Sequence, residues 1–173
     1  NDTHILFSER NFRSADGVRI FRFVEIGYAV PAHVSAELVV RQQSAMTALG
    51  KKDGDNSSGG IGYLDIAAFI RANGANPEKD LIELWKRIVF NIAVSNTDDH
   101  LRNHGFILTE NGWRLSPVYD VNPNLDKDAL SLNVTEEDNA LSVDLAIEVC
   151  EKFGIDKKDA VELAKGVLVT VCD

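Results

Sequence analysis

The segment "NPEKDLIELWKRIVFNIAVSNTDDHLRNHGF", residues 76–106, joins a strong helix signal to a dense cluster of polar side chains at residues 96–106, called the polar cluster below. Asn76 suits a helix N-cap and Pro77 the first helical position, and an acidic residue follows in the first turn. The helix is expected to end near Ser95, directly before the polar cluster. Its apolar residues recur at helical spacing and predict one buried face: Leu81, Leu84, Trp85, Ile88, Val89, Ile92 and Ala93.

A β-hairpin is predicted directly after the polar cluster. Two apolar segments flank Asn111 and Gly112, a dipeptide that suits the positive φ angles of a tight turn. If these two residues form the centre of the turn, Leu108 faces Leu115 across the hairpin. A bulge or a wider turn would shift this register by a residue or two.

The same register brings three oxygen-bearing side chains together, because Asn103 would face Asp120 and the helix end would hold Asp98 nearby. Carboxylate and amide oxygens suit Mg²⁺, which takes phosphate oxygens and waters as further ligands. A second carboxylate can accept the proton of a hydroxyl nucleophile. The kinase spacing D-x-x-x-x-N starts at Asp98, since Asp99 is one residue too close to Asn103. We therefore predict Asp98 as the catalytic base, Asn103 and Asp120 as metal ligands, and Asp99 as a supporting or exposed residue.

Other interpretations of the cluster stay open at this point. Asn96 or Thr97 could simply cap the helix and be followed by a solvated turn, although this leaves most of the cluster unexplained. His100 and His104 could bind zinc or iron, but no third nitrogen or sulfur ligand stands at a recognisable spacing. We expect His100 to brace the catalytic loop by hydrogen bonding. Arg102 is expected either to neutralise phosphate charge or to be an exposed cation.

The remaining residues predict a mainly helical chain with a small β component. Residues 3–23 alternate loosely around a turn at 15–17, which indicates a hairpin or entry ribbon. The polar, glycine-rich residues 51–60 are expected to form a mobile surface loop. Further helices are expected at 32–49, 63–72, 143–153 and 157–171, with Gly154 ending the third and Asp156 capping the fourth.

The composition favours a single domain and disfavours several functions. The 173 residues are 45% hydrophobic, and the net charge of −9 argues against direct binding of nucleic acid. No apolar run approaches the roughly 18 residues of a membrane span. Cys150 and Cys172 show no metal-type spacing and are expected to stay reduced in a cytoplasmic protein. Because Asn1 comes first and Met46 is the single methionine, we expect the chain to be a piece of a longer protein.

A family resemblance rests on two quoted stretches. "FNIAVSNTDDHLRNHGFIL" (90–108), followed by "WRLSPVYDVNP" (113–123), closely resembles the C-terminal lobe of HipA-like serine/threonine protein kinases. These kinases are the toxin halves of bacterial toxin–antitoxin pairs. A looser resemblance covers "SERNFRSADGVRI" (8–20) and "GYLDIAAFI" (62–70). The family commonly has Gly where Ser95 stands and Lys where Arg102 stands.

This resemblance implies a protein-kinase-like C-terminal lobe, a helical bundle with a β-hairpin at its active site, spanning residues 1–173. It implies ATP and Mg²⁺ as cofactors and the roles given above to Asp98, Asn103 and Asp120, with His100 in the same catalytic loop. In the family, a hinge between the lobes touches adenine. The matching residues here begin at Glu9 and depart from the usual hinge pattern. The lobe that precedes the hinge is missing, so the chain alone is expected to be inactive.

The resemblance also implies partners, namely a protein substrate and a small HipB-like DNA-binding antitoxin through which DNA contact would run. Two other functions stay open. One is a kinase-fold phosphotransferase that acts on a lipid or small molecule. The other is a non-catalytic, kinase-like binding module.

Overall fold

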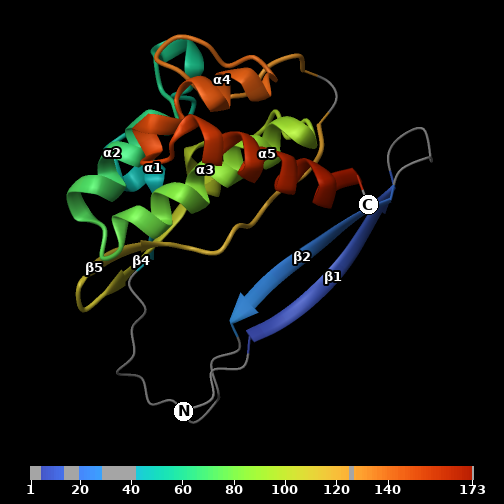
Figure 1. The fold of residues 1–173 in the computed structure, drawn as a ribbon. Helices are drawn as coiled ribbons and strands as arrows, with labels where there is room; N and C mark the ends of the chain where they lie inside the picture. Colours follow the sequence, from blue (N-terminus) through green and yellow to red (C-terminus); the bar gives the residue numbers. More distant parts are fainter. Residues whose placement is uncertain (1–4, 14–19, 29–41, 125–126, 173) are drawn as a thin grey trace.

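The computed structural model describes residues 5–13, 20–28, 42–124 and 127–172, in which helices predominate over two small antiparallel sheets (Figure 1). The strands are β1 (Ile5–Arg13), β2 (Ile20–Tyr28), β3 (Gln42–Ser44), β4 (Gly105–Thr109) and β5 (Gly112–Leu115). The α-helices are α1 (Ala45–Ala48), α2 (Tyr63–Asn73), α3 (Pro77–Ala93), α4 (Val143–Glu148) and α5 (Lys157–Cys172). Short 3₁₀ helices are η1 (Ser57–Gly59), η2 (Leu101–Asn103) and η3 (Cys150–Phe153).

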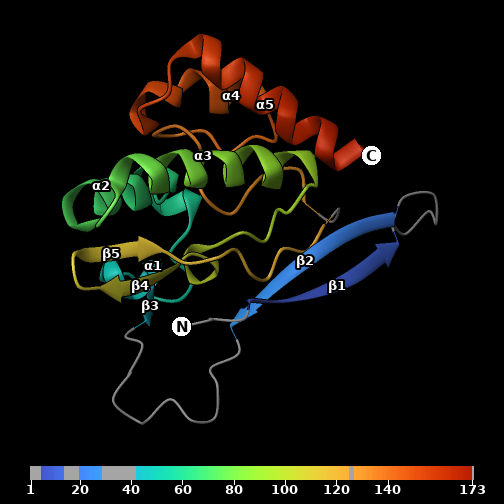
Figure 2. The same cartoon turned by 60° about the horizontal axis from the view of Figure 1, so that its bottom comes forward.

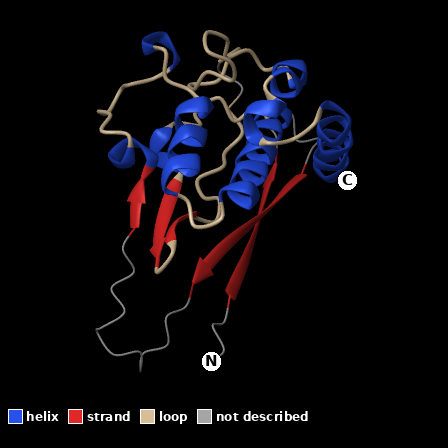
Figure 3. Ribbon diagram, turned by 60° about the vertical axis from the view of Figure 1, so that its left-hand side comes forward, coloured by secondary structure: helices blue, strands red, loops and turns tan. Residues whose placement is uncertain are grey.

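Helix α3 lies between two layers. The sheet β3-β4-β5 packs on one side together with α2, and α4 and α5 cover the other side (Figure 2). In the view of Figure 3 the helices gather above this sheet. The buried core is continuous across α3, where the ring nitrogen of Trp85 donates a hydrogen bond to the carbonyl oxygen of Ala146 at 2.7 Å. Such a bond removes the cost of burying the indole N–H.

The predicted helix of residues 76–95 is confirmed as α3. The side chain of Asn76 accepts a hydrogen bond from the backbone N–H of Lys79 at 3.2 Å, and Pro77 occupies the first turn. The helix ends at Ala93, two residues early, and Ser95 then adopts a φ of 55°. This left-handed conformation disfavours side chains with a Cβ atom and suits glycine.

The predicted hairpin is confirmed, but its register is wrong by two residues. Leu108 pairs with Trp113, not with Leu115, and Thr109 pairs with Gly112, so Glu110 and Asn111 form the turn. Gly112 instead begins strand β5 with a φ of 126°.

The reason for this register is a close approach between the hairpin and the end of α2. A Cβ atom at Gly112 would lie 2.8 Å from the carbonyl oxygen of Asn73. The N–H of Ala75 also donates a hydrogen bond to the carbonyl oxygen of Trp113 at 2.7 Å. The glycine is therefore required by tertiary packing rather than by the turn.

The helix predicted at 32–49 is correct only for Ala45–Ala48 in its described part. Residues 42–44 form β3, which pairs with β4, and α1 begins only at Ala45 after an N-cap by Ser44. Residues 32–41 lie outside the described part. A free sheet edge, which no local pattern reveals, decides the conformation of the three residues.

The remaining predicted elements agree with the structure in kind. Strands β1 and β2 form the N-terminal hairpin, while its turn at 15–17 lies outside the described residues. The helix predicted at 143–153 is divided into α4 and η3. Gly154 ends η3 with a φ of 75°, and Asp156 caps α5 through the N–H of Asp159 at 2.9 Å. Within the described residues, no helix is both long and apolar enough to span a membrane.

Two glycine substitutions test the packing of this fold. A Cβ at Gly62 would lie 2.5 Å from the carbonyl oxygen of Asn133, whereas a Cβ at Gly166 in α5 would meet nothing within 4 Å. We expect Gly62→Ala to lower the free energy of unfolding by about 1–3 kcal/mol because backbone must move. Gly166→Ala should raise it by about 0.5–1 kcal/mol through helix propensity. Chemical denaturation measures both, and similar effects of the two substitutions would contradict this packing.

Candidate active site

The adjacent aspartates of the polar cluster have opposite environments. The side chain of Asp98 is 61% exposed, and its Oδ1 lies 3.6 Å from the ammonium nitrogen of Lys127. The side chain of Asp99 is only 4% exposed. The alternatives left open for Asp99 are thus resolved, because it is buried and supports the loop while Asp98 faces solvent.

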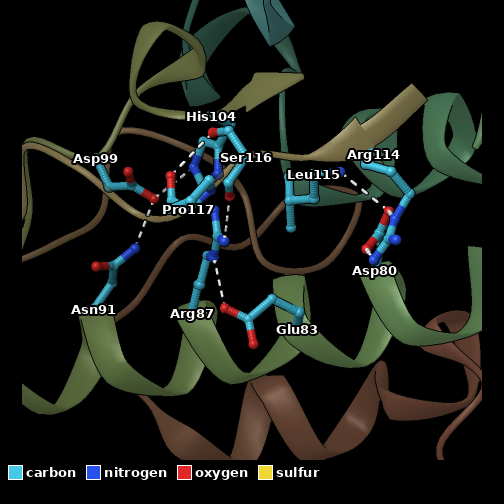
Figure 4. A network of polar contacts seen from close by, with 10 residues as sticks. All are labelled: Asp80, Glu83, Arg87, Asn91, Asp99, His104, Arg114, Leu115, Ser116 and Pro117. Atoms are coloured by element: carbon cyan, nitrogen blue, oxygen red, sulfur yellow. Dashed lines mark hydrogen bonds and ion pairs between the residues drawn. The ribbon is translucent and has the colours of Figure 1, made fainter. Parts of the chain in front are cut away.

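Asp99 receives three hydrogen bonds on one oxygen, Oδ2 (Figure 4 draws two of them). The donors are the Tyr63 hydroxyl at 2.6 Å, the Asn91 amide at 2.7 Å and the His104 Nε2 at 2.9 Å. Nε2 is assigned as the donor because a carboxylate can only accept. The bonds join α2, α3 and the residue before β4 to the loop, and they compensate the burial of the carboxylate.

The Tyr63 phenol stays protonated in this network. Its complete burial and, next, the neighbouring charge of Asp99 raise the pKa of Tyr63 well above the ordinary value. A tyrosinate would place two anions side by side in the core. Tyr63 is therefore a permanent donor to Asp99 at neutral pH.

A row of polar residues on α3 also holds the end of strand β5 (Figure 4). Asp80 accepts two hydrogen bonds at 2.9 Å from Arg114 and one at 3.0 Å from the N–H of Leu115. Arg87 donates to the carbonyl oxygen of Ser116 at 2.6 Å. Asp80, Arg87 and Asn91 lie seven and four residues apart, so helical geometry places them along one face. Helix α3 thus positions both the cluster and the segment after the hairpin.

That segment returns to the cluster by side-chain contact rather than by strand pairing. The Tyr119 hydroxyl donates a hydrogen bond to the carbonyl oxygen of Arg102 at 2.6 Å. Asp120 follows Tyr119 and Asn103 follows Arg102, so each predicted metal ligand is the next residue in sequence after a partner in this hydrogen bond. Asn103 is 6% exposed at the end of η2. Asp120 is exposed, and its Oδ1 accepts a hydrogen bond from Asn122 at 2.9 Å.

Asp120 has a φ of 56°, a left-handed conformation that non-glycine residues rarely adopt. Such strain persists only where surrounding contacts enforce it, and it is concentrated at functional sites. Here the preceding Tyr119 is bonded to Arg102, and the following Asn122 to Asp120 itself. The conformation of Asp120 therefore marks the segment as a candidate ligand position.

The polar loop of residues 51–60 contributes to the site. Arg102 donates a hydrogen bond to Nε2 of His100 at 3.0 Å and forms an ion pair with Asp53 of the loop. A pocket of about 210 Å³ opens between this loop and the cluster. Its lining includes Lys52, Asp53, Asp98, His100, Arg102 and Lys127. The bracing role of His100 stays a prediction. Glu9 lies in strand β1, and its side chain lies outside the description.

The described side chains of the polar cluster suit Mg²⁺ better than zinc or iron. Among the described residues, no three His, Cys, Asp or Glu side chains gather as a metal cage. His104 is bonded to Asp99, and His100 to Arg102, so the described residues do not support a zinc or iron site. An amide and a carboxylate, such as those of Asn103 and Asp120, would suit Mg²⁺ that takes phosphate oxygens and waters as its other ligands, and the assignment of these two residues stays a prediction.

Sequence reasoning missed the residues that position the site, namely Tyr63, Asp80, Arg87, Asn91 and His104. A usable signal existed on α3, where three polar residues interrupt an otherwise apolar face: Asp80, Arg87 and Asn91 are all buried. Buried polar groups require partners, so these positions indicate contacts with another segment. Which segments these residues contact depends on the tertiary fold and cannot be deduced from the helix pattern.

The described residues form a mainly helical domain in which a hydrogen bond from Tyr119 joins the segment of Asp120 to the D-x-x-x-x-N loop. The HipA-like C-terminal domain family matches residues 22–172 of the chain. A "Putative kinase" of Haemophilus influenzae is 36% identical over 100 residues, 53% of this chain and 29% of that protein. The "Putative kinase Y4mE" of Sinorhizobium fredii is 31% identical over 65 residues, 38% of this chain and 16% of that protein.

A solved structure shares the fold. HipA of Shewanella oneidensis MR-1, determined in complex with HipB and its operator DNA, superposes with a TM-score of 0.65 at 16% identity. The match covers 96% of this chain and 42% of that chain. The chain belongs to the HipA-like C-terminal domain family, and it spans less than half of each of these relatives.

The adjacent aspartates provide a matched test of the site's architecture. Asp99→Asn should lower the free energy of unfolding by about 2–4 kcal/mol, because charge-assisted hydrogen bonds are lost from a buried network. Asp98→Asn, of the same size and one residue away, should change it by less than about 0.5 kcal/mol. Urea denaturation of both variants measures the difference, and a reversed order of stabilities would contradict the assigned environments.

Proposed function

We propose that this domain is the catalytic C-terminal lobe of a HipA-like protein kinase. The kinase transfers the γ-phosphate of ATP to a serine or threonine hydroxyl and depends on Mg²⁺. One arrangement carries the proposal: buried Asp99 fixes the loop, Asp98 is exposed beside a pocket, and the hydrogen bond from Tyr119 to Arg102 ties the segment of Asp120 to the loop of Asn103. The kinase names of the two curated relatives and the HipA fold support it.

Each residue has a distinct role in this proposal. Asp98 orients the acceptor hydroxyl and accepts its proton. Asn103 and Asp120 hold Mg²⁺, which neutralises phosphate charge when bound. His100 braces Arg102, and Arg102 binds phosphate or remains tied to Asp53. The sequence order of a proposed base, an amide ligand and a later carboxylate ligand fits phosphoryl transfer, which is accelerated mainly by positioning of the reactants and neutralisation of charge.

A second pocket provides room for the nucleotide. It measures about 390 Å³, within the usual range for small-molecule sites, and Tyr119, the neighbour of Asp120, is among its lining residues. Its walls come from β3, β4 and the segment after β5: Gln42, Gln43, Ser44, Gly105, Phe106, Ile107, Ser116, Pro117, Val118 and Tyr119. A nucleotide bound here would point its phosphates toward the proposed metal ligands. An N-terminal lobe and Glu9 of the hinge would complete the site.

The proposal includes partners. HipA of Shewanella oneidensis was solved with HipB and operator DNA, and we propose a HipB-like antitoxin as a partner of the full-length protein. The net charge of −9 supports DNA contact through that partner rather than through this domain. The acceptor is a protein.

Phosphate transfer by the full-length protein tests the function. With γ-labelled ATP and Mg²⁺, wild-type protein should label serine or threonine residues, and Asp98→Asn should reduce kcat by about 10²–10⁴-fold. Asp128→Asn removes another exposed carboxylate as a control and should retain activity. Labelling of a lipid or small molecule alone would indicate the small-molecule phosphotransferase. Absence of any transfer, with nucleotide binding intact, would indicate the binding module.

A further inference from the structure

Lys127 faces the proposed base from outside the sequence motif. Its ammonium nitrogen lies 3.6 Å from Oδ1 of Asp98, and the two side chains are 54% and 61% exposed. Ion pairs as exposed as this one contribute little to stability, because both ions remain hydrated. A contribution to folding stability therefore does not explain why Lys127 lies beside Asp98.

The backbone on either side of Lys127 is fixed to the residues directly before Asp98. The N–H of Asn124 donates to the carbonyl oxygen of Ser95 at 2.9 Å, and the hydroxyl of Thr97 donates to the carbonyl oxygen of Asn124 at 3.0 Å. On the other side, Ser131 donates to the carbonyl oxygen of Thr97 through its N–H at 3.1 Å and its hydroxyl at 2.8 Å. These four bonds hold Asn124 and Ser131, on either side of Lys127, against the residues before Asp98, although the two segments lie far apart in sequence.

Two other cations, Arg102 and Lys52, line the pocket, and neither pairs with Asp98. Arg102, the cation of the motif itself, pairs with Asp53 and with His100. Lys52 also lines the pocket, but no ion pair joins it to another described side chain. Among the described cations, Lys127 is thus the one that pairs with Asp98. Its flexible four-carbon stem allows the ammonium to move while the backbone stays fixed.

We infer that Lys127 is a further catalytic residue, a cation that moves from Asp98 to the transferring phosphoryl group when nucleotide and acceptor are bound. The inference rests on the proposed kinase function. In the transfer, the acceptor oxygen forms a bond to the γ-phosphorus, the bond from that phosphorus to the ADP oxygen breaks, and the hydroxyl proton passes to Asp98. Lys127 stays protonated throughout, neutralises charge on the phosphoryl oxygens and leaves the Asp98 carboxylate available for the proton.

Substitutions in the full-length protein test this role. Lys127→Met should lower kcat by about 10²–10³-fold, the usual cost of removing one charge-stabilising group, while the melting temperature stays unchanged. Lys127→Arg should restore part of the loss because it keeps the charge. Lys158→Met is the control, since it removes an exposed lysine of α5 that does not line this pocket, and it should keep wild-type kcat.

Amine labelling of the wild-type protein gives a readout independent of turnover. Acylation of Lys127 by an acetylating reagent, quantified by mass spectrometry, should slow several-fold when Mg²⁺ and a non-hydrolysable ATP analogue are added. Acylation of Lys158, an exposed lysine outside the pocket, should not change. Contact between the ammonium and the γ-phosphate predicts this selective protection.

The outcomes separate the two claims. Wild-type phosphate transfer together with full activity of Lys127→Met, or an unprotected Lys127, overturns the role of Lys127 and leaves the kinase function standing. An effect of Lys127→Met on the KM for the acceptor alone also overturns it, because a contact with the phosphoryl group must change kcat. No transfer by the wild-type protein overturns both claims.

Discussion

The buried carboxylate of Asp99 is the interaction on which the site depends. A carboxylate withdrawn from water in a folded core is costly unless several donors replace the lost hydration. Here a tyrosine, an asparagine and a histidine all donate to one oxygen, and they come from α2, α3 and the residue before β4. The loop can therefore occupy one position only. Because Asp99 is directed inward, its neighbour Asp98 is left exposed, as its proposed role as a base requires.

Helix α3 sets the relative positions of the two halves of the site. Asn91 reaches the loop, while Asp80 and Arg87 hold the end of β5 and the residue that follows it. The contact between Tyr119 and Arg102 then closes the arrangement. A long, capped helix is a rigid element, and functional residues placed by rigid elements keep their geometry better than residues placed by loops alone. The same rigidity would preorganise the proposed metal ligands, Asn103 and Asp120.

Local signals in the sequence were sufficient for part of this architecture. Asn76, Pro77 and the apolar periodicity predicted α3, and the D-x-x-x-x-N spacing separated Asp98 from Asp99 before any geometry was known. The separation of the aspartates agrees with their environments, whereas the catalytic and metal-binding roles stay proposals. Gly154 and Asp156 likewise act through their own backbone neighbourhood, so their positions were predictable.

The errors have a common physical origin in contacts between distant segments. Gly112 was predicted to be a turn residue, but a glycine is needed there because the backbone of Asn73 lies too close for a Cβ atom. The observed hairpin register therefore differs from the predicted one by two residues. Residues 42–44 form a strand because the edge of β4 is available to them. The return of Asp120 was expected from strand pairing, but the observed link between its segment and the loop is the hydrogen bond from the Tyr119 hydroxyl to Arg102. Neither a glycine's close neighbour nor a side chain's distant partner is encoded in a local pattern.

The central claim is that this scaffold presents Asn103 and Asp120 to one divalent ion. Mn²⁺ binding to the full-length protein with a non-hydrolysable ATP analogue, followed by electron paramagnetic resonance, tests it most directly. If both side chains ligate the same ion, Asn103→Ala and Asp120→Ala should each weaken binding, and the double variant should bind little worse than either, which is a strong coupling in a double-mutant cycle. Unchanged affinity in the single variants, or strictly additive losses, would contradict the account.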